Sequence, residues 1–332
     1  VILFGADAKD FCAQTKTIKI NSYDNTKKIK PDIKDIEEFL NDKELGIIFF
    51  PGPSKHTNMK SIAPQVIDLI SLNIRNNKQI IGAIAADNSK LIKTFQIDQE
   101  SVDPDKIVIA GINTTINFKT ISGHGYQRKN EDKEYRFKLK ENKIEKISVI
   151  KDSISEENVQ SAIKTYAKEV GISEDQLRST MPYFKGPKDI KTWLKLTCFA
   201  KKTKPHELNY PFDIEDDMLI FTGTLDETEP LIMMETSSEK LVASIQKSVI
   251  ENLQELNDDA QLVLLFNCAI YNVMVPNYKN EIKELKLNNQ LKQTKIVGAY
   301  VNGEIGEYSK NTTSVCNGSI TGIIFGTHKK IG

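Results

Sequence analysis

The stretch Gln79–Ile84, with sequence QIIGAI, returns later in the chain as Lys295–Tyr300, with sequence KIVGAY. Each is an apolar run of strand length with a Gly-Ala pair at the same place, which is typical of a strand buried on both faces. An apolar strand precedes and follows each of them. These flanking strands are Gly46–Phe50 and Lys106–Ala110 in the first half, and Leu262–Phe266 and Ile320–Phe325 in the second.

The spacing of equivalent residues is nearly constant. It is 216 residues from Gly82 to Gly298, 217 from Phe49 to Phe266, and 215 from Gly111 to Gly326. A fixed internal period is the signature of a repeated unit. We therefore predict an internal duplication; the alternative is that two ordinary α/β segments match by chance.

Helical spacing of apolar residues separates the strands. Pro31–Leu45 and Met59–Ile74 are predicted helices in the first half, and Pro276–Leu291 is one in the second. A further helix is expected to begin near Ser155 and to end at Gly171. We predict an α+β fold of two related domains, 1–150 and 151–332, each a mixed β-sheet flanked by helices and built from a duplicated strand–helix–strand unit.

Composition excludes several classes of function. The 332 residues carry 45 basic and 45 acidic side chains, so a mainly nucleic-acid-binding surface is not expected. No apolar run approaches the ~18 residues of a membrane span. Cys12, Cys198, Cys268 and Cys316 are scattered without a C-x-x-C pair, which argues against structural zinc and against a disulfide framework. We expect a cytoplasmic protein without a metal or cofactor.

The sharpest local signal is the sequence VNGEIGE after the repeated strand KIVGAY. Gly303 and Gly306 would permit positive φ, or a close approach to a ligand or a neighbouring strand. Glu304 would then sit at a strand end, where strand–helix folds often recognise ligands. The alternative is a glycine turn with one solvated glutamate.

Several motifs together resemble the FIST domain family. GAYVNGEIG, with LLFNCA before it and SITGIIF after it, resembles the C-terminal FIST domain. GIIFFPGPS, QIIGAIAADN, KIVIAGI and TISGHGYQ resemble the N-terminal FIST domain, with Tyr126 where that family usually has tryptophan. The resemblance covers nearly the whole chain, and it is weak over residues 172–200.

The resemblance implies an intracellular, non-catalytic sensory module of signal transduction that binds a small ligand such as an amino acid. It also implies a signalling output protein or domain, and none is visible in this sequence. Residues Asn267–Tyr271 lack the "GR" that often follows this strand in the family. A cationic anchor is therefore missing, and the ligand can differ.

Two further side chains are candidates. Flanking glycines leave His124 open to a ligand, although a His fixed in a turn is the alternative. Cys268 follows a buried strand and could face the same pocket, although a free Cys is usually a small buried hydrophobe. His56, His206 and His328 are scattered, so the sequence gives a metal site little support.

The expected ligand site lies between the two halves. Asp87 and Asn88 hold the place in the first repeat that Gly303 and Glu304 hold in the second. The predicted ligand-binding residues are Asn267, Cys268, Asn302, Gly303, Glu304, Gly306, His124 and Asp87. The alternatives are a protein-interaction scaffold without a small ligand, and a hydrolase that uses Cys268 and His124.

Overall fold

The fold was analysed in a computed structural model. It describes residues 10–21, 23, 30–57, 61–73, 78–87, 90, 92–140, 143–151, 157–181, 197–222, 225, 227–275, 285, 291–309 and 312–328. The chain divides into two compact units. Unit 1 comprises residues 1–124, 242–272 and 277–332, and unit 2 comprises 125–241 and 273–276.

The first sheet of unit 1 has six strands in the order β1-β6-β2-β3-β19-β20. Strands β2 and β3 are parallel, and the other neighbours are antiparallel. The strands are β1 (Phe11–Lys19), β2 (Leu45–Phe50), β3 (Gln79–Ile84), β6 (Lys106–Thr114), β19 (Gly303–Ser309) and β20 (Thr312–Cys316).

The second sheet of unit 1 has four strands in the order β18-β17-β21-β7. They are β7 (Ile116–His124), β17 (Leu262–Cys268), β18 (Lys295–Val301) and β21 (Ser319–His328). Read from the other end, this is the order and direction of β1-β6-β2-β3. Phe49 faces Ala83 in the first ladder, and Phe266 faces Ala299 in the second. The duplicated unit predicted from the sequence is therefore present.

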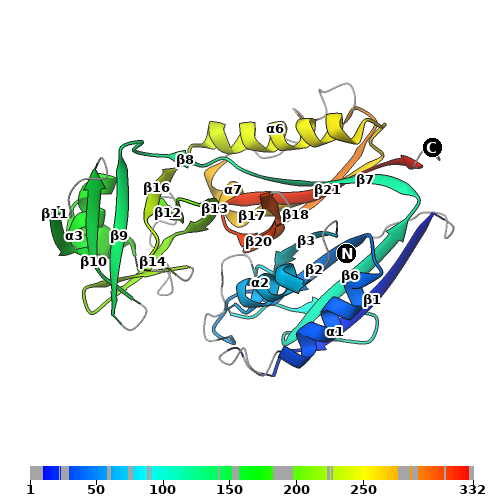
Figure 1. Cartoon of the computed structure of the whole chain (residues 1–332), viewed down its shortest axis with the longest axis horizontal. Coiled ribbons are helices and arrows are strands. Elements are labelled where there is room, and N and C mark those ends of the chain that lie inside the picture. The colour runs from blue at the N-terminus through cyan, green and yellow to red at the C-terminus, as the bar shows by residue number, and fades with distance from the viewer. Residues whose placement is uncertain are drawn as a thin grey trace. The chain divides into compact units, whose positions relative to one another are not determined.

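The two sheets of unit 1 face each other, and helices lie on their outer faces (Figure 1). The rings of Phe49 and Phe266 meet edge to face between the sheets, with centroids 5.6 Å apart. Helices α1 (Lys30–Asn41) and α2 (Ala63–Asn73) cover the first sheet. Their buried residues follow helical spacing, as in Ile33, Ile36 and Leu40.

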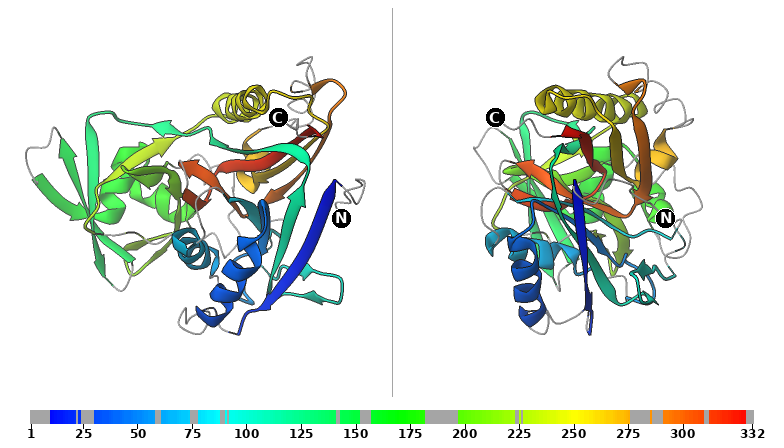
Figure 2. Two further views of the ribbon diagram at one scale, coloured as in Figure 1. Left: turned by 45° about the vertical axis from the view of Figure 1, so that its right-hand side comes forward. Right: turned by 90° about the vertical axis from the view of Figure 1, so that its right-hand side faces the viewer.

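A long helix, α6 (Ser238–Leu256), lies over the second sheet, as both views of Figure 2 show. A Cβ on Gly123 of β7 would lie 2.1 Å from the Ser248 hydroxyl, so glycine permits this close packing. The buried face of α6 is formed by Leu241, Ile245, Val249 and Leu253. This helix was not predicted from the sequence.

Unit 2 contains a nine-stranded antiparallel sheet with α3 (Ala162–Val170) and α4 (Glu174–Thr180). Aromatic rings fill its core; among them, Tyr135 and Phe137 each contact Phe199 edge to face. Its strands are β8 (Gln127–Arg128), β9 (Lys133–Lys140), β10 (Lys143–Lys151), β11 (Glu157–Ser161), β12 (Cys198–Lys201), β13 (Lys204–Asn209), β14 (Pro211–Glu215), β15 (Met218–Phe221) and β16 (Leu231–Glu235).

Along the chain, unit 2 is an insertion. The chain leaves unit 1 after β7 and returns to it within α6, inside the second repeat. The proposed domain division at residue 150 follows the change in sequence character, and it stays a prediction beside this division into compact units.

Two local expectations change, and a third stays a prediction. The segment 157–161, expected to begin a helix, is strand β11, because it pairs with β10; α3 begins only at Ala162 and ends at Gly171 in the left-handed region, as predicted. The stretch GEIG is part of strand β19 rather than a turn, and neither of its glycines has positive φ. The expected helix 276–291 lies almost wholly outside the described residues.

Candidate functional site

Glu304 is completely buried on β19. Successive strand residues point to opposite faces of a sheet. Ile305 joins the core beneath the helices, so Glu304 points the other way, toward the second sheet. Its neighbours there are Ser319 on β21 and Cys268 on β17. The carboxyl group of Glu304, on β19 of the first sheet, thus contacts residues on two strands of the second sheet, β17 and β21.

One carboxyl oxygen of Glu304 is held by Ser319. The Ser319 hydroxyl donates to Oε2 at 2.8 Å, and the Ser319 amide donates to the same atom at 3.1 Å. Tyr308, on the same strand as Glu304, contacts the Ser319 hydroxyl at 2.8 Å. The other oxygen, Oε1, is buried and receives no hydrogen bond from a nitrogen or oxygen donor of the described residues, and the thiol of Cys268, a weak donor, is the remaining polar neighbour of the carboxyl group. Burial raises the pKa of Glu304 well above its ordinary range, and the Ser319 donors oppose this only in part.

Cys268 ends strand β17 and is 8% exposed. Burial raises the pKa of its thiol well above the usual value, and the neighbouring Glu304 raises it further. Cys268 is therefore a neutral thiol at neutral pH, whereas a nucleophilic cysteine must be a thiolate. Asn267, also buried, precedes it and lies opposite Ile320 and Tyr300 in the ladders.

Asn302 joins the second repeat to the first. Its amide donates to the Ile84 carbonyl at 2.8 Å, and its side-chain Nδ2 donates to the Ala85 carbonyl at 3.1 Å. Gly303 follows in register with Ile84, where a Cβ would lie 2.8 Å from Cδ1 of Ile84. A Cβ on Gly306 would lie 2.5 Å from the Thr321 hydroxyl. Both glycines thus serve close strand approach rather than a turn.

His124 lies at the end of β7, in register with Ser319. This places it one strand away from the residue that holds Glu304, and its side chain is half-buried. Asp87 contacts its own loop. Its Oδ2 accepts the amides of Ile92 and Lys93, at 2.6 and 3.3 Å, and so shapes its own loop.

The structure thus brings Glu304 and Cys268 together, with His124 one strand away and Asn302 at the start of β19. Ser319 and Tyr308 were missed by the sequence analysis. They lie in an ordinary strand and an ordinary hairpin, and only the pairing of distant strands brings them to Glu304.

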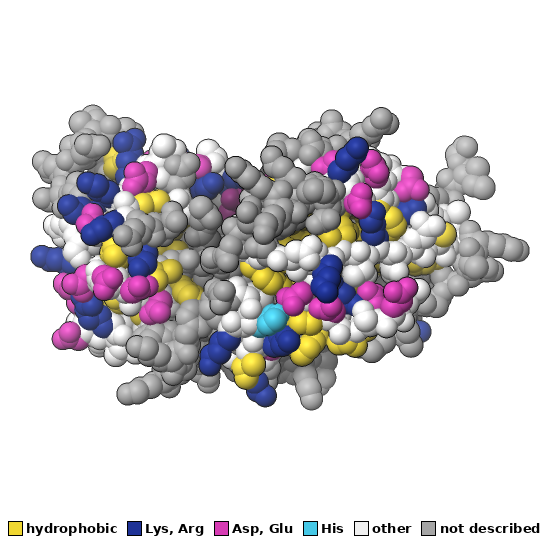
Figure 3. Space-filling view, turned by 90° about the horizontal axis from the view of Figure 1, so that it is seen from below, with side chains coloured by type: hydrophobic (Ala, Val, Ile, Leu, Met, Phe, Trp, Pro, Cys, Tyr) yellow, Lys and Arg dark blue, Asp and Glu magenta, His cyan; other side chains and the backbone are white. Residues whose placement is uncertain are grey.

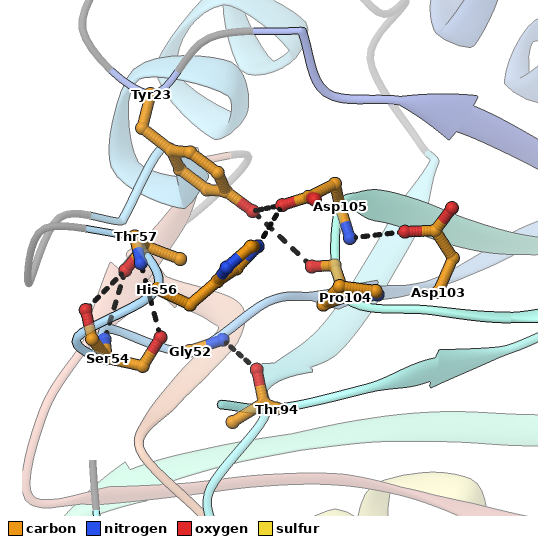
Figure 4. Close-up of polar contacts among 9 residues, drawn as sticks. All are labelled: Tyr23, Gly52, Ser54, His56, Thr57, Thr94, Asp103, Pro104 and Asp105. Carbon is orange, nitrogen blue, oxygen red and sulfur yellow. Dashed lines mark hydrogen bonds and ion pairs between the residues drawn. The ribbon is translucent and has the colours of Figure 1, made fainter. Parts of the chain in front are cut away.

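A second polar cluster lies in the first repeat (Figure 4). Asp105 accepts a hydrogen bond from the Tyr23 hydroxyl at 3.0 Å and pairs with Nε2 of His56 at 2.8 Å. The loop after β2 is tied down beside it, because the Gly52 amide donates to the Thr94 hydroxyl at 2.9 Å. Burial and Asp105 raise the pKa of Tyr23. These contacts fasten the 51–57 loop to the segment before β6.

The surface carries no field of a single sign on the face seen in Figure 3, where acidic and basic side chains are intermixed over the described residues. Among these residues no cluster of three or more His, Cys, Asp or Glu side chains has the arrangement of a metal site. None of the described helices is both long and apolar enough to cross a membrane.

Comparison with known protein families gives two matches. The FIST N domain matches residues 1–133, and the FIST C domain matches residues 190–307. No curated protein matches the chain significantly. The two matches fall in the order expected from the sequence motifs; the first includes β1 to β8, and the second includes β12 to β18 and the first part of β19. The chain therefore belongs to the FIST family, whose domains are sensory modules of signal transduction.

Proposed function

We propose that this protein senses a small ligand through the cluster around Glu304, between the two repeats. The observation that carries the proposal is the second carboxyl oxygen of Glu304, which is buried with no nitrogen or oxygen donor in the described residues and with only the weak Cys268 thiol beside the carboxyl group. Leaving a buried polar atom unsatisfied costs about 1–3 kcal/mol, so such an atom in a native protein is a candidate for ligand contact.

The proposed ligand is a free amino acid. Its ammonium group would donate to Glu304 Oε1, while main-chain N–H groups at the strand ends would face its carboxylate. An ammonium requires the charged carboxylate, whereas burial favours the neutral acid. Ligand binding would therefore displace the proton from Glu304. The site would select ligands whose cationic group interacts with the carboxylate strongly enough to offset the free energy of removing that proton.

The signal would travel through β19. This strand belongs to the second repeat in sequence, yet it pairs with β3 of the first repeat, and Glu304 lies opposite Ala83. A ligand bound to Glu304 would change the contacts of β19 with Cys268 of β17 and with Ser319 of β21. It would shift the balance between two arrangements of the repeats by its differential affinity for them. An output protein or domain would read this change.

The hydrolase alternative is less well supported. Cys268 would have to be a thiolate, and both burial and the neighbouring carboxyl group disfavour that form. The scaffold alternative has one observation in its favour. Four large apolar side chains, Ile92, Phe95, Ile97 and Val102, are 54–64% exposed within a short segment. Exposed apolar clusters of this kind often mark protein contacts.

A thermal-shift screen of the purified chain against amino acids tests the proposal. A ligand that binds only the native state stabilises it by about 2.7 kcal/mol at a hundredfold excess over Kd. Glu304→Gln keeps the shape and the acceptor for Ser319 but removes the charge, so it should abolish the shift. Glu307→Gln, three residues along the same strand, is the matched control and should retain it. A flat screen, or a shift that survives Glu304→Gln, would contradict the proposal.

A further inference from the structure

The four outer strands of the two sheets in unit 1 are not protected alike. An exposed strand edge offers unpaired N–H and C=O groups to any passing strand, and proteins guard such edges with charge, covering elements or polar side chains. The outer strands are β1 and β20 in the first sheet, and β7 and β18 in the second. Three of them are protected by charge, by polar side chains or by a covering helix.

Strand β1 is largely polar, with Lys16 half-buried and Lys19 exposed. Strand β7 carries Lys119, which is paired with Glu255 of α6 at 2.5 Å. Strand β20 is covered by α2, and the Ser71 hydroxyl donates to its Thr313 carbonyl at 2.8 Å. Each of these edges therefore presents charge, polar side chains or a covering helix.

Strand β18 has none of these protecting features in the described part of the chain. Its sequence is KIVGAYV, and its only charged residue is Lys295, at its first position. Val297, Gly298 and Ala299 in its middle are exposed, and Val297 is 39% exposed. Val297 is also one of only five large hydrophobic side chains found exposed among the described residues.

The first repeat shows which kind of element pairs with the edge that corresponds to β18. Strand β3 is the counterpart of β18, and its residues are almost entirely buried. The difference is β19, which pairs antiparallel with β3 and places Gly303, Glu304 and Ile305 opposite Ile84, Ala83 and Gly82. In the second repeat the equivalent edge carries no described strand. An extended strand in antiparallel register is the element that fits it.

We propose that the edge of β18 binds β18 of a second copy of this chain, in antiparallel register about a twofold axis. Centred on Gly298, the pairing sets Val297 opposite Ala299 of the partner copy, so that the exposed apolar residues cover each other. Ile296 faces Tyr300, a favourable pairing of a β-branched with an aromatic residue.

Charge also suits this pairing. Lys295 of each copy faces Val301 of the other, so the two lysines lie at opposite ends of the ladder and like charges are not opposed. The same patch serves on both copies, as a closed twofold interface requires. The four-stranded sheet would continue across the axis into its partner.

The test is the molar mass of the full chain, measured by light scattering after size exclusion over a range of concentrations. The wild-type protein should form a dimer that dissociates on dilution. Val297→Lys places an ammonium in the middle of the edge and should abolish the dimer. Val102→Lys makes the same change at an exposed apolar residue of β5 (Val102–Asp103), outside β18, and should leave the dimer intact.

A second variant tests the register. Val297→Cys with Ala299→Cys, in a Cys12→Ser background that removes the exposed native thiol, should give a disulfide-linked dimer on mild oxidation. Thermal unfolding of every variant checks that it is folded. A monomeric wild-type protein, or a Val297→Lys protein that dimerises as the wild type does, would overturn the proposal; binding of a foreign extended peptide by such a monomer would identify a different occupant.

Discussion

Ser319 directs both its amide and its hydroxyl to a single oxygen of Glu304, at 3.1 and 2.8 Å. These donors favour the charged carboxylate, but complete burial favours the neutral acid, and burial prevails. The carboxyl group is thus held in place by one oxygen while its proton-binding equilibrium is displaced upward. This combination leads to two predictions about pH.

The first prediction concerns stability. Because the folded-state pKa of Glu304 lies above its ordinary value of 4.5, the folded protein keeps a proton that the unfolded chain has lost. The free energy of unfolding should therefore fall as pH rises above 4.5, until the folded-state pKa is passed, by up to about 1.4 kcal/mol per pH unit from this group.

Glu304→Gln removes that contribution, so its stability should depend less on pH. Urea unfolding across this range measures the difference from the wild type. Glu307→Gln should keep the wild-type slope because Glu304 remains. Equal slopes for the wild type and Glu304→Gln would show that Glu304 is charged in the folded protein.

The second prediction concerns the proposed ligand. If an ammonium group binds charged Glu304, binding releases the proton that the unliganded protein holds. Affinity should then rise with pH, by up to about tenfold per unit below the folded-state pKa. Calorimetry in buffers of different ionisation enthalpy counts the released protons. Binding without proton release would mean that the ligand does not displace the Glu304 proton.

The third prediction separates the cysteines. Cys12 is exposed, whereas Cys268 is buried and its pKa is raised. A thiol reagent at neutral pH should label Cys12 rapidly and Cys268 only slowly, because the thiolate is the reacting form. Cys12→Ser should remove the fast phase. Fast labelling that persists in this variant and disappears in Cys268→Ser would revive the hydrolase alternative.

The fourth prediction concerns the core between the sheets. Phe266 is 2% exposed and meets Phe49 across the repeats, so Phe266→Ala should lower the free energy of unfolding by about 3–5 kcal/mol. Phe95 is 54% exposed, and Phe95→Ala should stay within about 0.5 kcal/mol of the wild type. Chemical denaturation of the two variants compares them directly. Similar losses would mean that the sheets do not share this core.

The repeated strands could be read from the sequence because each is a continuous apolar run, and their counterparts also share spacing and the Gly-Ala pair. The position of β19 in the first sheet could not be predicted from the sequence. Its pairing with β3 joins Gly303 to Ile84, and nothing local to either segment specifies the other. A glycine-rich stretch therefore suggested a turn where long-range pairing makes a strand.

The site was predicted to a similar extent. Glu304 and Cys268 were candidates because each follows a repeated strand, and the sheets bring them together. Asp87 was included by analogy between the repeats, yet the loop of the first repeat uses it to hold its own backbone. Helix α6 was missed, although its buried residues recur at helical spacing, because the insertion before it obscures its place in the repeat.

The crossing of β19 into the first sheet also affects how the protein is made. Strand β3 ends at residue 84. One of its two neighbours, β2, precedes it in the chain, but the other, β19, begins only at residue 303. During synthesis the β3 edge of the first sheet stays bare until the 219 residues from 84 to 303 have been added. Such an edge is prone to wrong pairing, and contacts so distant in sequence form slowly. The nascent chain should therefore depend on chaperones until β19 has been made and can pair with β3.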